Sequence, residues 1–505
     1  MQRRQFIKRS TAGLFALPLW QVACNQKSTL PFPFKIRSED QSGHFLRFGL
    51  PDWEAEQDQH FKTVVVGGGV AGLSAACHLQ DQDFVLLEMA DRLGGTSSAV
   101  EHQQQWIGQG AHYDLAYPEN FGKEVLAFLE QLKIIRYNPI AKLWQFNDRQ
   151  HIIPPYAEAQ YWQQGDRRPQ LIGDFDDHQA FTALLSEYQG KMPLPSRLID
   201  KEHLHLNSLS FKDFLTQAHP FKLQSLEAID YVMRDDYGAK SDQVSALAGI
   251  HYFMCRPYGD PSVEIFSPTS GNYYFIDKMA KQLPSAKCRL QQMVVNIETA
   301  AHGYSLQVLD LKKERQYHIH CEQLIFAAPK FLLPTIFPAH ASTFKAVKYS
   351  PWLVINYVLK KPLHQSTNFW QNEYITANHP LVGIVNTASH REQESVQVIS
   401  LYHNYQPQER QHLLKIKKDP SEVFQFGLKA IEELIQEDIT EQVATAYLHF
   451  MGHAMPIPSV GYLNQPIQSP DNLAFAGVDT FRLPLLFEAI DSGIQAAQKM
   501  STPTI

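Results

Sequence analysis

Cysteine is scarce in this chain of 505 residues, with five in all: Cys24, Cys77, Cys255, Cys288 and Cys321. No two of them form a Cys-x-x-Cys pair, which excludes the usual signatures of zinc ribbons and dithiol reductases. One interpretation is a disulfide between Cys288 and Cys321, and the simpler one is that the cysteines are small buried hydrophobic residues. We therefore assign no chemistry to them.

Charge is also scarce, because only 19% of the residues are charged. The 45 basic and 52 acidic side chains give a net charge of −7, without a long basic stretch or a basic stripe interleaved with aromatics. Nucleic acid is therefore not an expected partner. With 44% hydrophobic residues and no enrichment in Gly and Pro, the composition predicts a globular protein of two lobes.

Long apolar runs are absent as well. No run of about 18 apolar residues occurs, so we expect no permanent transmembrane helix. A basic opening with Arg3 and Arg4 precedes a short apolar stretch over residues 12–22, which is typical of a signal peptide. The stretch Arg-Arg-Gln-Phe-Ile-Lys resembles the bacterial twin-arginine motif. It predicts a signal peptide over residues 1–24, export by the twin-arginine machinery and a periplasmic or otherwise exported protein.

The end of this segment resembles a lipoprotein box. Val22 and Ala23 precede Cys24, which would be acylated, while Gln21 replaces the usual aliphatic residue. The sequence leaves open whether Cys24 carries a lipid that anchors the protein to a membrane. The alternative to a signal peptide is that residues 1–24 form a basic arm followed by a buried first helix.

Residues 63–79 have the pattern of a strand, a glycine turn and a helix. Gly67 allows a tight turn, Gly69 lets the backbone approach a pyrophosphate, and Gly72 lets helix and strand pack closely. A second apolar strand ends on Glu88, 21 residues after Gly67. A carboxylate at this spacing binds a ribose hydroxyl in dinucleotide-binding folds. A glycine-rich surface turn does not explain the strand, helix and acid in this order.

A second glycine pair follows Glu88, in the stretch Arg92 to Thr96 that contains Gly94 and Gly95. An Arg beside such a pair can hold phosphate or ribityl oxygens. The chain here resembles the flavin-dependent amine oxidase superfamily, which also contains phytoene desaturases and protoporphyrinogen oxidases. Thr96 stands where the family commonly has another Arg. The resemblance implies FAD as the cofactor and Arg92, Gly94, Gly95 and Thr96 as residues that bind it.

Later segments extend the resemblance. Residues 108–113 resemble the stretch that runs past the flavin ring, 270–297 the adenine-side turn, helix and strand, and 473–497 the closing motif. Glu488 stands where the family usually has Gly. The cofactor contacts implied by these segments are Gly110, Ala111, Val294, Gly477, Asp479 and Ala489.

The order of these landmarks implies an α/β fold. Its FAD-binding domain is Rossmann-like, of the glutathione-reductase type, and is assembled from separated segments; a mixed α+β substrate domain completes it. We place the FAD-binding domain at 62–150, 265–340 and 445–500, and the substrate domain at 151–264 and 341–444. Only one Gly-x-Gly-x-x-Gly occurs, which argues against a reductase that binds two nucleotides.

The flavin itself accepts hydride, so the protein need not supply an acid or a base. His112 and His453 are the candidate catalytic residues, with a hydrogen-bonded packing role as the alternative. Amine oxidases often place a lysine near the flavin. Lys345 and Lys348 lie in the corresponding region of the sequence, and the alternative is that both are solvated surface residues. Two His-x-His pairs occur, His203 with His205 and His318 with His320, but neither has a third ligand nearby, so no metal site is predicted.

Amine oxidases commonly hold the substrate nitrogen against an aromatic ring shortly before the closing Gly-Ala. Leu485 stands at that position. Phe481 or Phe487 would supply the ring instead, and the alternative is that these two aromatic residues pack in the core. We predict non-covalent FAD, since no Cys follows Cys321. The predicted enzyme is an oxidoreductase that moves hydride from a small-molecule substrate, most simply by oxidising an amine C–N bond. Desaturation or dehydrogenation of an apolar substrate and a non-redox flavoprotein are the alternatives.

Overall fold

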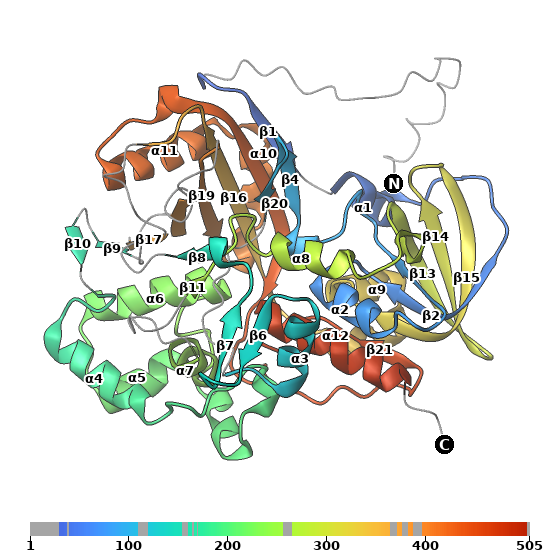
Figure 1. Cartoon of the computed structure of the whole chain (residues 1–505), viewed down its shortest axis with the longest axis horizontal. Helices are drawn as coiled ribbons and strands as arrows, with labels where there is room; N and C mark the ends of the chain where they lie inside the picture. Colours follow the sequence, from blue (N-terminus) through green and yellow to red (C-terminus); the bar gives the residue numbers. More distant parts are fainter. Residues whose placement is uncertain are drawn as a thin grey trace, which may run out of the picture.

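The computed structural model describes residues 30–37, 40–109, 120–153, 160–163, 166–168, 170–255, 265–363, 371–375, 382–386 and 396–501. Two large sheets organise these residues, one of seven strands and one of eight. They lie at opposite ends of the molecule, with helices between and below them in Figure 1. This arrangement confirms the predicted α/β fold.

The seven-stranded sheet is built from segments far apart in the chain. Its order is β12 (Cys288–Arg289), β3 (Phe84–Leu87), β2 (Gln59–Val66), β15 (Arg315–Phe326), β14 (Gly303–Asp310) and β13 (Gln292–Ala300), and β21 (Leu473–Phe475) also pairs with β15. The strands β12, β3, β2, β15 and β21 run parallel. The end of β2 is a continuous buried run of valines, as expected for a parallel strand covered on both faces.

Three helices near this sheet matter for the site. They are α2 (Val70–His78), α8 (Tyr273–Ala280) and α12 (Leu486–Ser501). Helix α2 follows β2 directly and contacts both of the others. Eight of its nine residues are buried, so α2 lies inside the molecule and brings its amino-terminal end to the carboxyl ends of the parallel strands.

The eight-stranded sheet has the order β1 (Phe34–Arg37), β20 (Val443–Pro456), β16 (Tyr349–Leu359), β19 (Val398–Asn404), β18 (Val382–Asn386), β17 (Gln371–Ile375), β9 (Gln160–Gln163) and β10 (Asp166–Arg168). Helix α11 (Ser421–Ile435) packs apolar side chains against β16 and β19, with α10 (Gln411–Lys418) beside it. Tyr357 of β16 donates a hydrogen bond to the carbonyl oxygen of Phe424 on α11.

This sheet differs from the predicted division of the chain at one boundary. We placed 445–500 with the cofactor domain, but β20 pairs with β16 and β1 in the eight-stranded sheet. The strand begins at Val443 and ends at Pro456. The chain therefore returns to the seven-stranded sheet only with β21. The physical reason is the long antiparallel pairing with β16, which no local pattern around residue 445 reveals.

Four more helices form a layer below the eight-stranded sheet in Figure 1. They are α4 (Phe175–Ser186), α5 (Phe211–Ala218), α6 (Leu223–Tyr237) and α7 (Ala246–Met254). The shorter elements are α1 (Asp40–Phe48), α3 (Lys123–Gln131), α9 (Leu333–Ile336) and the pairs β4 (Ala99–His102) with β5 (Gln105–Gly108), β6 (Ile135–Asn138) with β7 (Leu143–Phe146), and β8 (Ile152–Ile153) with β11 (Ile265–Phe266).

Among the described residues, no helix has the length and apolar character to cross a membrane.

The four cysteines in the described part of the chain are all free. The interpretation that Cys288 and Cys321 form a disulfide is therefore wrong. Cys77, Cys255 and Cys321 are buried, and burial raises the pKa of both the Cys77 and the Cys321 thiol to about 12. These thiols stay protonated at neutral pH and behave as small apolar residues.

Candidate functional site

The first glycine turn joins β2 to α2 and is closely packed. Gly67 has φ +108°, and a Cβ there would lie 2.9 Å from the backbone nitrogen of Ala328. A Cβ on Gly72 would lie 1.9 Å from the carbonyl oxygen of Gly67. Because neither position has room for a side chain, both glycines have the steric roles that the sequence predicts.

Gly69 differs from these two, because the space above it is open. The nearest neighbour of a Cβ there would be the carbonyl oxygen of Gly94, 4.0 Å away. Gly69 is the N-cap of α2, and no side chain of the described residues caps that end. The first backbone N–H groups of α2 therefore remain free to bind an anion, where the helix dipole favours negative charge.

The second glycine turn lies directly against the first. Gly69 and Gly94 form a parallel bridge, and Gly94 donates its N–H to the carbonyl oxygen of Gly68 at 2.9 Å. A Cβ on Gly95 would lie 3.5 Å from the Cα of Gly69. The structure thus brings the two predicted glycine motifs together as one backbone cradle at the amino-terminal end of α2.

Glu88 lies at the end of β3 beside this cradle. One of its carboxylate oxygens, Oε2, accepts the N–H of Gly68 at 2.6 Å, and the other, Oε1, accepts the N–H of Ala90 at 2.8 Å. These two hydrogen bonds fix the carboxylate beside the cradle, at the position that the sequence predicts for a ribose-binding acid. Val294 lies on β13, next to this position, because Gln292 donates its N–H to the carbonyl oxygen of Glu88 at 2.9 Å.

Arg92 and Thr96 flank the second glycine pair, but their side chains have other surroundings. The guanidinium of Arg92 donates to the carbonyl oxygen of Ala99 at 2.6 Å and pairs with Asp91, with 3.2 Å between Nε and Oδ1. Thr96 is exposed in a short 3₁₀ turn over Gly95–Ser97. Phosphate contacts by these two side chains stay predictions.

The carboxy-terminal motif meets the cradle through α12. A Cβ on Gly493 would lie 2.2 Å from the carbonyl oxygen of Ala71, so α12 and α2 cross in backbone contact. Gly477 has φ +129° and donates its N–H to Ser492 Oγ at 2.9 Å. Ala489 lies in the first turn of α12 and is half-buried. Gly477 and Ala489 are therefore held close to the start of α2.

Asp479 belongs to a buried ion pair that the sequence did not reveal. Its Oδ1 accepts from Lys330 Nζ at 2.9 Å, and its Oδ2 accepts the N–H of Lys330 at 2.8 Å and the hydroxyl of Tyr349 at 2.9 Å. Lys330 is fully buried and also donates to the carbonyl oxygen of Ala476 at 2.6 Å. Burial lowers the pKa of Lys330, and the charge of Asp479 opposes that shift. The pair fixes the turn around Gly477.

The sequence offers one signal for this pair, the position of Lys330. It follows Pro329 directly, shortly after the strand β15 ends at Phe326. The two lysines considered instead, Lys345 and Lys348, are exposed, in agreement with the alternative that they are solvated. A direct contact of Asp479 with a cofactor stays a prediction.

His453 lies on β20 and connects to the same network. Its ring stacks on Phe331 at 4.1 Å between centroids and contacts Tyr349 edge-on at 5.8 Å. Burial and the nearby charge of Arg410 lower the pKa of His453 to about 4. The imidazole is therefore neutral at pH 7 and a weaker base than an exposed histidine. The other predicted histidine, His112, and the predicted contacts Gly110 and Ala111 lie outside the described residues.

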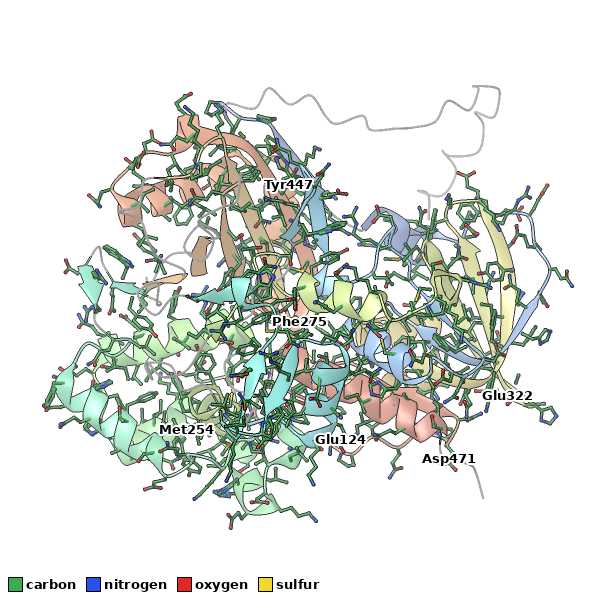
Figure 2. The ribbon with its side chains drawn as sticks, in the orientation of Figure 1. Glu124, Met254, Phe275, Glu322, Tyr447 and Asp471 are labelled. Carbon is green, nitrogen blue, oxygen red and sulfur yellow. The ribbon has the colours of Figure 1, made fainter. Side chains whose placement is uncertain are left out.

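The aromatic residues near the start of α12 are packed in the core. Phe487 is fully buried, with its ring 4.4 Å from that of Phe121 and 5.8 Å from that of Phe275, which lies near the centre of Figure 2. Phe481 stacks on Phe344 at 5.6 Å. Neither Phe487 nor Phe481 is a free ring wall, which agrees with the core-packing alternative. Leu485 is buried beside them.

Glu488 is the residue that departs from the family pattern, and its carboxylate is completely buried. It accepts the N–H of Ser196 at 2.6 Å, and Arg482 lies 3.5 Å away. Its neighbour Asp491 accepts both Nε and Nη2 of Arg197, at 2.8 and 2.9 Å. Burial raises the pKa of Glu488. These contacts attach the first turns of α12 to the loop that contains Ser196 and Arg197.

Together these features fit a dinucleotide with a pyrophosphate. Gly69 leaves open space, α2 offers uncapped N–H groups, and Glu88 is fixed where a ribose would lie. Side chains at Gly67 or Gly72 would destroy the turn that creates this space. The cradle therefore has the shape and the donors that a nucleotide cofactor requires.

Comparisons with known proteins agree with a nucleotide cofactor in this cradle, because the matching family contains flavin. A sequence model of the family described as flavin containing amine oxidoreductase matches residues 70–501. No individual curated protein sequence matches the chain.

Several solved structures share the fold. A putrescine oxidase bound to putrescine is 12% identical with a TM-score of 0.62, covering 87% of this chain and 99% of that chain. A cyclohexylamine oxidase from Brevibacterium oxydans is 14% identical with a TM-score of 0.58, covering 87% of this chain and 98% of that one. A protein assigned as a protoporphyrinogen oxidase from Exiguobacterium is 13% identical with a TM-score of 0.59, covering 88% and 98%.

Proposed function

This chain belongs to the family of flavin-containing amine oxidoreductases, and we propose that its flavin is FAD, bound without a covalent link. The observation that carries the proposal is the cradle of two adjacent glycine turns at the uncapped end of α2. An FAD molecule contains the pyrophosphate and the ribose that this cradle and Glu88 suit. The absence of a Cys after Cys321 supports non-covalent binding.

Binding is divided among the described residues by their chemistry. The N–H groups after Gly69 would hold the pyrophosphate, Glu88 would accept from the adenosine ribose, and Val294 would pack on the adenine side. Gly477, in the turn after β21, and Ala489, in the first turn of α12, would approach the flavin end of the cofactor. When bound, the flavin accepts a hydride from the substrate. The chain's own task is to orient the substrate and exclude water.

As an oxidoreductase of this family, the protein is proposed to oxidise the C–N bond of an amine. Family membership and the structural likeness to a putrescine oxidase and a cyclohexylamine oxidase support this reaction. Leu485, in place of a ring that would hold a small ammonium group, supports a bulky substrate bound by apolar contacts. We propose His453, neutral at pH 7, and His112 as the residues to test for proton transfer.

The test begins with the cofactor and continues with the products. Denaturation of the purified protein should release FAD into solution, which chromatography identifies. Oxidation of an amine should then yield an aldehyde, the released amine or ammonia, and hydrogen peroxide when dioxygen is the acceptor. A protein that takes up no FAD would overturn the cofactor assignment.

Desaturation of an apolar substrate is the second candidate function. The same Leu485 favours it, because an apolar wall suits a hydrocarbon, and a protein assigned as a protoporphyrinogen oxidase shares the fold. A product with a longer conjugated system, formed without aldehyde, would identify this reaction in place of amine oxidation.

The proposed route for this protein is export in the folded state with its cofactor. It rests on Arg3 and Arg4, which lie outside the described residues, and on the apolar stretch that follows. Replacing both arginines by lysine should keep the protein in the cytoplasm with its leader uncut. Normal export of that variant would contradict the routing. Mass measurement of the exported protein would show whether Cys24 carries lipid.

A further inference from the structure

The hairpin of β6 and β7 has a buried base and an exposed apolar tip. It follows α3 directly and lies in front of the helices in the lower half of Figure 1. At the base, Ile135 pairs with Phe146, and only 1% and 4% of their surfaces are exposed. Toward the turn, Tyr137, Leu143 and Ile140 are 46%, 40% and 94% exposed. Exposure thus rises along the hairpin and is greatest at its tip.

The tip has an ordered turn. Asn138 accepts the N–H groups of Ile140 and Ala141 on its side-chain oxygen, at 3.0 and 3.1 Å, as Asn commonly does in tight turns. Tyr137 and Trp144 pair across the two strands, with ring centroids 5.3 Å apart. The turn therefore presents Ile140 outward, in front of an aromatic pair.

The charged side chains along the hairpin have one sign: Lys142 lies beside the turn, Arg136 lies on β6 near the base, and Lys133 precedes β6. Lys133, Arg136 and Lys142 are exposed, and no acidic residue occurs between Glu130 and Asp148 in the sequence. Within the described part of the chain, none of the three basic side chains has a carboxylate within ion-pair distance. The protein as a whole has a net charge of −7. The hairpin is thus a local basic site on an acidic protein.

We propose that this hairpin docks on a lipid bilayer with anionic headgroups. A protruding apolar tip can insert Ile140 below the headgroups, where apolar surface leaves water. The exposed Tyr137 ring suits the interface between headgroups and acyl chains, while Trp144 packs behind it against the core. Lys142 beside the turn, with Arg136 and Lys133 toward the base, supplies positive charge that anionic headgroups attract near the surface. This docking is independent of the proposed redox function.

The test is co-sedimentation of the flavin-loaded full chain with vesicles. One set of vesicles contains phosphatidylcholine alone, and the other contains phosphatidylcholine with phosphatidylglycerol. We compare the unmodified protein, Ile140→Asp, the triple variant Lys133→Gln/Arg136→Gln/Lys142→Gln, and Leu223→Asp. Leu223 is 71% exposed at the start of α6, so Leu223→Asp controls for loss of an exposed apolar residue. All four proteins share the same amino terminus.

The unmodified protein should bind the anionic vesicles, and more weakly as salt screens the headgroups. The triple variant should lower the partition coefficient about 100-fold and Ile140→Asp at least about tenfold, while Leu223→Asp changes it less than about twofold. Equal binding by all four proteins, or no binding to anionic vesicles, would overturn the proposal. So would self-association that only Ile140→Asp abolishes. If Ile140→Asp loses its flavin or its melting transition, the surface-only triple variant decides.

Discussion

Gly69 and Gly72 lie one helical turn apart at the start of α2, yet they serve different purposes. A Cβ on Gly72 collides with the carbonyl oxygen of Gly67, whereas a Cβ on Gly69 meets only open space. Folding therefore requires glycine at position 72, whereas glycine at position 69 is required only by what binds there. Variants at the two positions separate protein stability from cofactor affinity.

We predict that Gly69→Ala leaves the unfolding free energy of the flavin-free protein within about 0.5 kcal/mol but weakens FAD binding at least tenfold by blocking the pyrophosphate. Gly72→Ala should cost about 3 kcal/mol of stability through overpacking. Urea denaturation measures the first quantity and fluorescence titration with FAD the second. Unchanged FAD affinity in Gly69→Ala would contradict this placement of the pyrophosphate.

Lys330 and Asp479 form the buried ion pair that fixes the turn around Gly477. Each charge is buried and compensated by the other, so removing one partner leaves an unpaired charge. Lys330→Met and Asp479→Leu should each cost about 3–5 kcal/mol. The double variant should cost less than the two single variants combined, because no buried charge remains. A double-mutant cycle by urea denaturation checks this, and strictly additive costs would show that the pair has no coupling energy.

His453 provides a pH dependence whose sign follows from its pKa of about 4. Below about pH 6.5 the unfolded chain binds a proton at this histidine, whereas the folded chain does not until the pH approaches 4. The unfolding free energy therefore falls as the pH is lowered through this window. His453→Phe retains the stack on Phe331 and should remove about 1 kcal/mol of the loss between pH 7 and pH 5. An identical loss in the variant would contradict the assignment.

At the scale of elements, the crossing of α2 and α12 holds the site together. Gly493 allows backbone contact, and Ser74 of α2 donates its hydroxyl to the carbonyl oxygen of Ile490 on α12 at 2.8 Å. Because α12 also contains Ala489 and contacts Gly477 through Ser492, its position would determine where the flavin end of the proposed cofactor lies.

We expect Gly493→Ala to move α12 away from α2, since the added Cβ would lie 2.2 Å from the carbonyl oxygen of Ala71. The variant should lose about 2–3 kcal/mol of stability and bind FAD more weakly as well. Gln495→Ala, on the same helix and half-buried, is the matched control and should change neither by much. Full FAD affinity in a destabilised Gly493→Ala protein would show that the crossing is only structural.

At the scale of the whole molecule, the nucleotide cradle was predictable because its requirements are local. Glycine at fixed spacing, a β-branched strand before it and an acid after the next strand all lie within residues 63–96. The ion pair of Lys330 and Asp479 was not predictable, because its partners are 149 residues apart and a lysine is ordinarily exposed. The placement of β20 likewise depends on its pairing with β16, which only the folded chain shows.

Anaerobic stopped-flow reduction of the bound flavin tests the proposed amine oxidation most directly. The panel contains short alkyl amines and benzylamine, bulky amines with apolar groups, polyamines and apolar polyenes. We predict rapid bleaching by a bulky amine and slow bleaching by the small ones, with faster small-amine reduction in Leu485→Tyr through a cation–π contact of about 0.5–2 kcal/mol. A protein loaded with FAD whose flavin no amine bleaches, but which a polyene reduces, would contradict amine oxidation.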